Sequence, residues 1–447
     1  MPFIPNTDAD RKAMLERIGV NSFEELIANI PGELRFKQDF NLPAPLSEME
    51  VAHEIHHKTR CNQGIFDAIS FLGGGVYDHF IPAAVGHIIS RSEFYTAYTP
   101  YQPEVSQGTL QAIYEYQSMI AELMNMEVAN ASLYDGGSAL AEASLMAIAE
   151  ANRNKILVSQ AVHPHYRQII RTYGHGQKIE IKTIELENGI TNLSDLASQI
   201  DDKTAAVVIQ HPNFLGNLEE VFEISKLAHD VGALLITSND PISLGILEPP
   251  GNYDADIATG EGQCLGNSLN FGGPNLGILA SKFKLIRRMP GRIAGATVDS
   301  QGRRGFVLTF QTREQHIRRE KATSNICTNQ ALNALAATVY LALMGQRGIQ
   351  DVATLCLQNS HYLMDQIQNL AGFHLVYASP FFKEFAITTP VPAGEIVEKL
   401  MLQNIYAGID LSQFDYGLKN SLLIAVTEKR TREEMDVFVE ALKMFKK

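Results

Sequence analysis

The middle of the chain alternates short apolar segments with helical ones, and this alternation limits the folds that are open to it. Apolar runs lie at 156–158, 205–209 and 233–237. The helical segment 218–230 carries its apolar residues on one face and stops at Gly232. Continuous apolar strands separated by helices of this length indicate a parallel sheet covered on both faces. We therefore predict an α/β fold.

The rest of the chain completes this plan. A helical run at 330–370 leads to strand-like runs at 385–388 and 422–426, and a capping box of Thr431 with Glu434 opens a last helix. We expect three parts in chain order: a helical N-terminal arm (1–60), a large α/β domain (61–328) and a small C-terminal α+β domain (329–447). This is the plan of the aspartate-aminotransferase-like enzymes, fold type I of the pyridoxal-phosphate (PLP) enzymes. A shared fold does not by itself give a function.

The segment 231–280 reads like the strand core of a PLP enzyme, yet it contains no lysine, and Lys226 and Lys282 lie outside it. PLP chemistry needs a lysine amine that holds the cofactor as an imine. Gln263 or Cys264 stands where that lysine is expected, and neither side chain can form an imine. We therefore expect that the chain is not catalytic alone.

A glycine-rich turn before the expected helix 140–152 could hold an anion. Gly136, Gly137 and Ser138 would present free N–H groups and the positive end of a helix dipole to the phosphate of PLP. Asp135 could equally cap the same helix. The sequence leaves both interpretations open.

Two further residues follow predicted strands at the carboxyl ends, where α/β folds bind ligands. His163 comes after the strand at 156–158 and could stack on a cofactor ring, or it could belong to a turn. Asp240 ends the strand at 233–237 after two polar residues and could pair with the pyridinium nitrogen of PLP. Both belong to the candidate cofactor pocket.

A tyrosine-rich run at 94–108 is another candidate site. Three tyrosines, amide side chains and a carboxylate gather before a helix, and two prolines stiffen the connection, as suits a pocket. The other interpretation is a rigid loop whose tyrosines pack internally. The candidate residues are Tyr95, Tyr98, Thr99, Tyr101, Gln102, Glu104, Ser106 and Gln107.

Composition excludes several classes of protein. The 37 Lys+Arg and 50 Asp+Glu residues give a net charge of -13, which disfavours nucleic acid as a partner. The four cysteines lie far apart without a CxxC pair, so we expect no metal site and a reducing cytoplasm. The N-terminus lacks the features of a secretion signal, and the apolar run 331–344 is too short to span a bilayer. We expect a cytoplasmic protein without a membrane role.

These residues, with the runs at 288–292 and 311–328, resemble the glycine cleavage system P-protein, or glycine decarboxylase, over nearly the whole chain. The runs at 99–108 and 311–328 are long and distinctive. Because the chain has 447 residues and lacks the lysine-bearing motif, it resembles subunit 1 of the two-subunit form of this family.

The resemblance implies an oxidoreductase of glycine catabolism, glycine dehydrogenase (decarboxylating). Two copies of this chain would join two copies of subunit 2, which carries PLP covalently, with none covalent on this chain. The heterotetramer would decarboxylate glycine and pass the aminomethyl group to lipoylated H-protein. The tyrosine-rich run would reach into the site of subunit 2, and this chain's own pocket would be a degenerate twin lined by Gly136, Gly137, Ser138, His163, Asp240 and Gln263.

Two alternatives remain at this point. The chain could be a self-sufficient PLP enzyme, an aminotransferase or a lyase, that uses an unusual lysine such as Lys282. It could also be a purely structural partner that stabilises subunit 2 without touching substrate.

Overall fold

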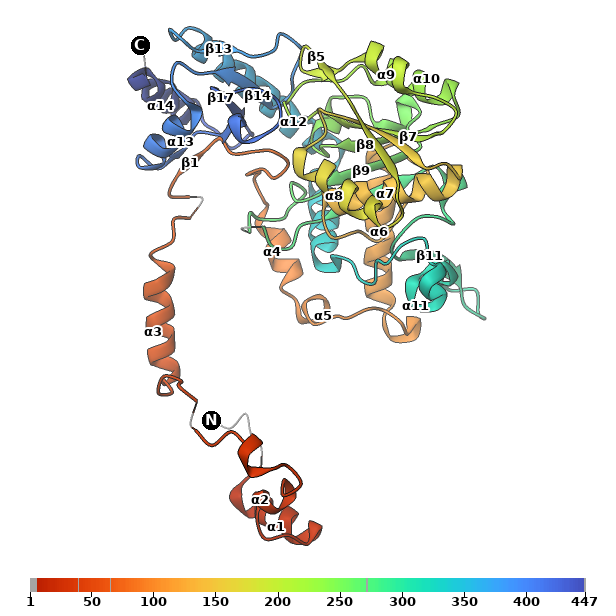
Figure 1. The fold of residues 1–447 in the computed structure, drawn as a ribbon, viewed down its shortest axis with the longest axis vertical. Helices are drawn as coiled ribbons and strands as arrows, with labels where there is room; N and C mark the ends of the chain where they lie inside the picture. Colours follow the sequence, from red (N-terminus) through yellow and green to blue (C-terminus); the bar gives the residue numbers. More distant parts are fainter. Residues whose placement is uncertain (1–5, 39, 65, 271, 446–447) are drawn as a thin grey trace. The chain divides into compact units, whose positions relative to one another are not determined.

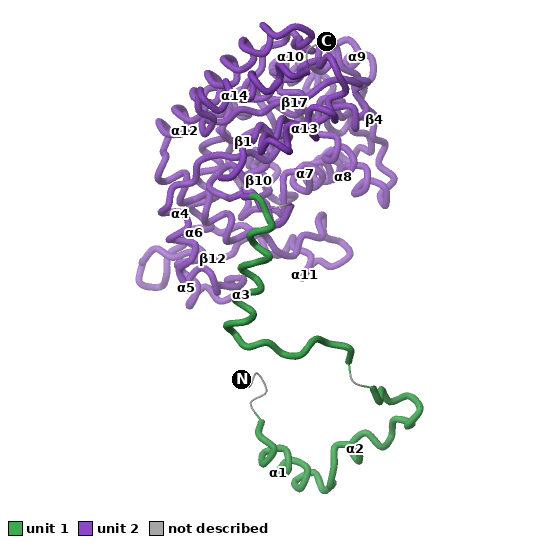
Figure 2. Tube along the Cα trace, turned by 90° about the vertical axis from the view of Figure 1, so that its left-hand side faces the viewer, with its two compact units in different colours: residues 1–63 green, residues 64–447 purple. Residues whose placement is uncertain are grey.

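The computed structural model describes four stretches of the chain: residues 6–38, 40–64, 66–270 and 272–445. Contacts divide the chain into two units, 1–63 and 64–447 (Figure 2). Residues 64–447 form one unit, so the expected boundary between 328 and 329 stays a prediction. No helix in the described stretches is both long and apolar enough to cross a membrane.

The first unit consists of short helices: α1 (Asp8–Ile18), α2 (Phe23–Leu26), η1 (Gly32–Leu34) and α3 (Glu48–Thr59). Thr7 forms a capping box with Asp10 at the start of α1, and Ser47 forms one with Glu50 at the start of α3. None of the described residues in 1–63 is buried. The described part of this unit has no core of its own, so local caps rather than packing stabilise its helices.

A seven-stranded sheet forms the centre of the second unit, in the order β2-β10-β9-β8-β7-β3-β4. Its strands are β2 (Val128–Ala129), β3 (Lys155–Ser159), β4 (Glu180–Ile184), β7 (Thr204–His211), β8 (Leu234–Asn239), β9 (Ile257–Glu261) and β10 (Gly277–Ser281). The pairs from β4 to β9 are parallel, whereas β10 is antiparallel to both neighbours. The α/β prediction is confirmed.

Helices cover both faces of this sheet (Figure 1). They are α6 (Gln107–Leu123), α7 (Gly136–Ala151), α8 (Pro164–His175), α9 (Leu193–Gln199), α10 (Val221–Asp230) and α12 (Ala331–Gln368). Successive strand residues point to opposite faces. On β7, Val208 belongs to a buried cluster with α7 and α8, and its neighbour Val207 to one with α9 and α10. Ala258 of β9 packs on the same face as Val207, in a cluster with α6 and α12.

Shorter elements complete this part of the second unit. They are α4 (Ala83–Ile89), α5 (Ser92–Tyr95), η2 (Pro103–Val105), α11 (Gln315–Arg318) and the hairpin of β11 (Ile293–Val298) with β12 (Arg304–Thr309). Phe306 and Leu308 of the hairpin pack against Leu110 and Ile113 of α6.

The C-terminal part forms a second, smaller sheet. Its strands are β13 (His374–Leu375), β14 (Glu384–Thr388), β16 (Ile409–Asp410) and β17 (Ser421–Ala425), covered by α13 (Ala393–Met401) and α14 (Arg432–Leu442). Thr431 and Glu434 form the expected capping box before α14. Helix α12 contributes to the cores of both sheets and breaks at Gly345, whose φ is 58°.

Candidate functional site

Three parallel strands of the large sheet bring polar side chains to one edge. His163 follows β3, Asp240 follows β8 and Glu261 ends β9. The carboxyl ends of parallel strands are the usual ligand-binding edge of an α/β sheet. These side chains line one small cavity together with Lys383 and Glu384, which come from the start of β14 in the smaller sheet.

A buried lysine occupies the centre of this pocket. Lys383 Nζ lies 2.8 Å from Asp240 Oδ2 and 3.0 Å from His79 Nε2, and 3.5 Å from the centre of the Tyr77 ring. The Lys383 side chain is 2% exposed and that of Asp240 is 10% exposed. Burial lowers the pKa of Lys383, but the nearby Asp240 carboxylate more than offsets this effect, so the pKa lies above its ordinary value. Lys383 is therefore an ammonium ion paired with Asp240.

Sequence analysis missed Lys383 because the search for a lysine followed the strand core at 231–280. Lys383 reaches the pocket from a different sheet, and its partner Asp240 lies far away in the sequence. The only signal was its position beside Phe382 and an apolar strand, where a charged side chain is buried only if it is paired.

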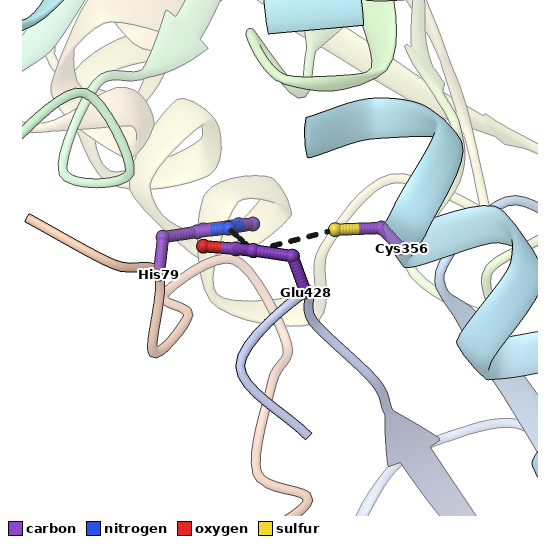
Figure 3. Close-up of side chains that lie close together, drawn as sticks. All are labelled: His79, Cys356 and Glu428. Atoms are coloured by element: carbon purple, nitrogen blue, oxygen red, sulfur yellow. Dashed lines mark hydrogen bonds and ion pairs between the residues drawn. The ribbon is translucent and has the colours of Figure 1, made fainter. Parts of the chain in front are cut away.

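The imidazole of His79 extends this network to Glu428 and Cys356 (Figure 3). Because the Lys383 ammonium can only donate, His79 Nε2 accepts and Nδ1 carries the proton that it donates to Glu428 Oε2, at 2.6 Å. Burial raises the pKa of Glu428, but the hydrogen bonds that its carboxylate accepts from His79 and from the Phe80 amide outweigh burial and lower the pKa. Cys356 Sγ lies 3.5 Å from Glu428 Oε2. His79, Cys356 and Glu428 each offer one atom that could bind a metal ion, and these atoms lie within 4.8 Å of one another. The hydrogen bonds described here already give each of the three side chains a partner.

The start of α7 differs from the expected glycine-rich turn, because the helix already begins at Gly136 rather than at Leu140. Asp135 caps it, and its Oδ1 accepts a hydrogen bond of 2.8 Å from the Ser138 amide. The Gly136 amide donates to Glu261 Oε2 at 2.9 Å. Two carboxylates therefore occupy this helix terminus, and the interpretation of Asp135 as a cap is the one that the geometry matches.

Close packing explains the two glycines. A Cβ atom on Gly136 would lie 2.7 Å from the Tyr166 hydroxyl, and one on Gly137 would lie 2.6 Å from Ile169 Cδ1. Both contacts are with α8. The glycines allow α7 and α8 to approach each other, and this packing accounts for them without a phosphate.

The Glu261 side chain ties together three backbone segments. Besides Gly136, its carboxylate accepts hydrogen bonds of 3.0 Å from the amides of Gln263 and Leu276. Burial raises the pKa of Glu261 to about 7, against the effect of these amides.

His163 is fixed by its neighbours. Its Nε2 donates to the Gly74 carbonyl at 2.9 Å, and its Nδ1 accepts from the His165 amide at 3.1 Å. The ring stacks on Tyr166 with centroids 4.7 Å apart. Burial lowers the pKa of His163 to about 4, so the imidazole is neutral. The stacking partner of this ring is thus a tyrosine of the same chain.

Gln263 lies beside the cavity and is bound on both ends of its amide. Its Oε1 accepts from the Tyr77 amide at 2.9 Å, and its Nε2 donates to the Asn267 carbonyl at 2.7 Å. Cys264 is buried, and burial raises its pKa. Neither position offers an amine to the pocket.

Lys282 lies at the opposite edge of the sheet. It follows β10, which runs antiparallel, and its Nζ pairs with Asp254 at 2.7 Å and with Asp256, before β9, at 3.0 Å. Its position therefore excludes Lys282 from the pocket around Asp240.

The tyrosine-rich run lies at the surface, around α5 and η2. The side chains of Tyr95, Tyr98 and Tyr101 are 68%, 86% and 55% exposed. Tyr95, Tyr98 and Thr99 line a hollow of about 180 Å³ together with residues of α12 such as Leu335. The expected alternative, a loop with internally packed tyrosines, does not describe these side chains.

Other members of the run have different surroundings. Gln107 is structural, because its amide pairs with both backbone groups of Phe306, at 2.8 and 2.9 Å. Gln102 and Glu104 are exposed, and Ser106 is partly buried at the start of α6. The Arg292 guanidinium lies 5.8 Å from the centre of the Tyr101 ring. The structure thus brings Tyr95 and Tyr98 to one hollow at the surface, whereas Tyr101 lies near Arg292 and Gln107 binds the β12 backbone.

Comparison with known proteins identifies the family. The model of the glycine cleavage system P-protein family matches residues 1–442. This chain belongs to that family. The "Probable glycine dehydrogenase (decarboxylating) subunit 1" of Chloroherpeton thalassium is 58% identical over 443 residues, 99% of both chains. The protein of the same name from Carboxydothermus hydrogenoformans is 53% identical over 442 residues, also 99% of both.

Solved structures agree with this assignment. The crystal structure of glycine decarboxylase (P-protein) of the glycine cleavage system, in inhibitor-bound form, has 43% sequence identity and a TM-score of 0.92, and the match covers 100% of both chains. A NifS-like protein matches 84% of this chain and 98% of its own at 12% identity, with a TM-score of 0.63. This second likeness shows the fold alone, that of the fold type I PLP enzymes.

Proposed function

We propose that this chain is subunit 1 of glycine dehydrogenase (decarboxylating) and acts in the cytoplasm in a complex of two copies of each subunit. Subunit 2 brings the lysine that holds PLP, the group that stabilises negative charge during loss of carbon dioxide. The complex decarboxylates glycine and passes the aminomethyl group to lipoylated H-protein. Relatives that match 99% of this chain and are named subunit 1 support the proposal.

The observation that carries the proposal is that the described residues of this chain's pocket supply no available amine. Gln263 is bound to Tyr77 and Asn267. Lys383, the lysine that does line the pocket, is paired with Asp240 at 2.8 Å. A chain of this family that supplies no imine lysine depends on another subunit for the reaction.

The exposed tyrosines support a role at the site of subunit 2. Tyr95 and Tyr98 project beside a hollow, and the stiff segment between Pro100 and Pro103 fixes their neighbours. Aromatic side chains of this kind are enriched at protein interfaces. We infer that Tyr98 and Glu104 of this chain shape the access of glycine and of the lipoyl group at the subunit interface.

Reconstitution tests the assignment. The chain alone, subunit 2 alone and the mixture are each incubated with PLP, and we measure the visible absorbance of the imine and the glycine-dependent exchange of carbon dioxide. We expect exchange only in the mixture. Exchange by this chain alone would overturn the proposal in favour of a self-sufficient enzyme.

Variants of the tyrosine-rich run test its role. We expect Tyr98→Phe and Glu104→Gln each to lower decarboxylation by the assembled complex about tenfold, as for the loss of a hydrogen bond at a reacting site. Tyr173→Phe on α8 and Glu187→Gln are matched controls outside the run. Unchanged rates for both test variants, in complexes that assemble normally, would leave a purely structural partner as the better description.

A further inference from the structure

We propose that this chain replaces the cofactor with its own side chains: Lys383 stands where the pyridinium nitrogen of PLP would bind, and Glu261 stands where the phosphate would bind. The replacement locks the small sheet onto the large one and closes the pocket to PLP. This inference concerns the pocket of this chain and does not depend on the activity of the complex.

The pyridinium nitrogen of PLP would bind at Asp240. An aspartate after the strand is the group that pairs with a pyridinium nitrogen in this fold. Here its Oδ2 is taken by Lys383 Nζ at 2.8 Å, and its Oδ1 accepts the Ile242 amide at 3.1 Å. A pyridinium ring would have to displace an ammonium whose other contacts, to His79 and the Tyr77 ring, hold it in place.

The phosphate of PLP would bind at the start of α7. A helix N-terminus is a ready site for a phosphate, but the Gly136 amide already binds Glu261 at 2.9 Å and the Ser138 amide binds Asp135 at 2.8 Å. A phosphate placed here would find neither of these two amides free, because each already donates to a carboxyl oxygen.

The free volume agrees with this assignment. The cavity between Asp240, Glu261 and Lys383 has about 30 Å³ of free space, room for one or two water molecules and not for a pyridine ring. A wider hollow of about 640 Å³ shares His163, Tyr166 and Glu261 with the lining of this cavity. Its described lining contains no lysine or arginine, so it offers no cation for a phosphate. The residues present do not fit PLP.

Lys383 cannot serve as the imine lysine in this position. The ring nitrogen of PLP and the carbon that bears its aldehyde lie on opposite sides of the pyridine ring. A lysine that forms the imine must stand at the aldehyde side, whereas Lys383 Nζ stands on the aspartate that marks the nitrogen side. Lys383 is a structural cation.

The same contacts join the two sheets. Lys383 precedes β14 of the smaller sheet and binds Asp240 at the end of β8 of the larger one. The adjacent Glu384 accepts hydrogen bonds from the Tyr77 hydroxyl at 2.6 Å and the Gly74 amide at 2.7 Å. The chain thus makes internally the cross-link that a bound cofactor would supply.

Equilibrium dialysis of the full chain against PLP tests closure of the pocket. We expect less than about a tenth of an equivalent to be retained, because neither charged end of PLP has a free partner. Retention of one equivalent per chain that inorganic phosphate displaces would overturn the proposal. No subunit 2 and no turnover enter this measurement, so its failure is distinguishable from failure of the proposed function.

Thermal unfolding tests whether the Lys383–Asp240 pair holds the two sheets together. We expect Lys383→Met to lower Tm by about 5 °C or more, because it leaves the buried Asp240 carboxylate unpaired. The double variant Asp240→Asn with Lys383→Met should recover part of that loss. Lys282→Met is the matched control, since Lys282 is also a lysine paired with aspartate, here Asp254 and Asp256, but is 25% exposed and far from the pocket. If Lys383→Met lowered Tm no more than the control does, or if the double variant recovered none of the loss, the proposed role of this pair would be wrong.

Discussion

At the scale of single residues, burial determines which side chains of the pocket carry charge. His163 and Glu384 both line the cavity, and burial shifts the pKa of each toward its neutral form, to about 4 and about 7. Lys383 keeps its charge because Asp240 lies 2.8 Å away. The pocket therefore holds one charged pair, Lys383 with Asp240, among groups whose pKa values burial shifts toward the neutral form.

The pKa of Glu384 predicts a pH dependence of stability. Its ordinary value is 4.5, and burial raises it to about 7 in the folded protein. Between these values the folded chain holds a proton that the unfolded chain has lost, so this group makes stability fall as pH rises from 4.5 to 7. Glu384→Gln removes that slope. We therefore expect the free energy of unfolding of the variant, minus that of the parent, to increase by on the order of 2 kcal/mol as the pH rises from 4.5 to 7.

Urea unfolding at a series of pH values measures this difference. His163 and His211, whose pKa values burial lowers to about 4, act in the opposite direction, but they act equally in both proteins and cancel in the comparison. The exposed Glu187, changed to glutamine, is the control. Parallel curves for Glu384→Gln and its parent would contradict the prediction.

At the scale of elements, the approach of α7 to α8 depends on glycine. A Cβ atom at Gly136 would meet the Tyr166 hydroxyl at 2.7 Å and Glu261 Cβ at 3.0 Å. We therefore expect Gly136→Ala to lower the free energy of unfolding by about 1–3 kcal/mol. A Cβ atom at Gly86 in α4 would meet no described atom within 4 Å, so Gly86→Ala should raise stability by about 0.5–1 kcal/mol. Urea unfolding that moved both variants in the same direction would contradict this account of α7.

Elements with a strong local pattern could be predicted from the sequence. The apolar runs at 156–158, 205–209 and 233–237 coincide with β3, β7 and β8, and Thr431 caps α14 as expected. Local apolar spacing and capping chemistry determine these elements. The sequence predicts the start of α7 too late, at Leu140, because glycine has low helix propensity, whereas Asp135 and tertiary packing extend the helix to Gly136.

The pocket could be predicted only in part. His163 and Asp240 reach one edge because parallel strands end there, and this much follows from the order of strands and helices, whereas Glu261 was not among the candidates. Lys383 could not be found in the same way, because its position depends on how the smaller sheet packs on the larger one. Pairings between residues this far apart in sequence leave no local pattern.

At the scale of the whole molecule, the two units differ in how they are stabilised. Residues 64–447 contain extensive buried clusters, whereas none of the described residues in 1–63 is buried. On α3, Met49, Val51 and Ile55 are 78%, 44% and 53% exposed. Exposed apolar side chains in such number mark a surface that packs on another protein. We expect the first unit to pack on subunit 2 in the assembled complex.

Removal of residues 1–63 tests this expectation. Because the buried clusters all belong to residues 64–447, the truncated chain should keep the Tm of the full chain within about 2 °C. Its affinity for subunit 2, measured by sedimentation, should fall at least about tenfold, since the apolar surface of α3 would no longer be covered on binding. Met49→Ser with Ile55→Ser should reproduce most of that loss, and Arg11→Ala on α1 should not. A truncated chain that assembled with full affinity would show that the first unit packs elsewhere, and the tyrosine-rich run would then be the principal contact with subunit 2.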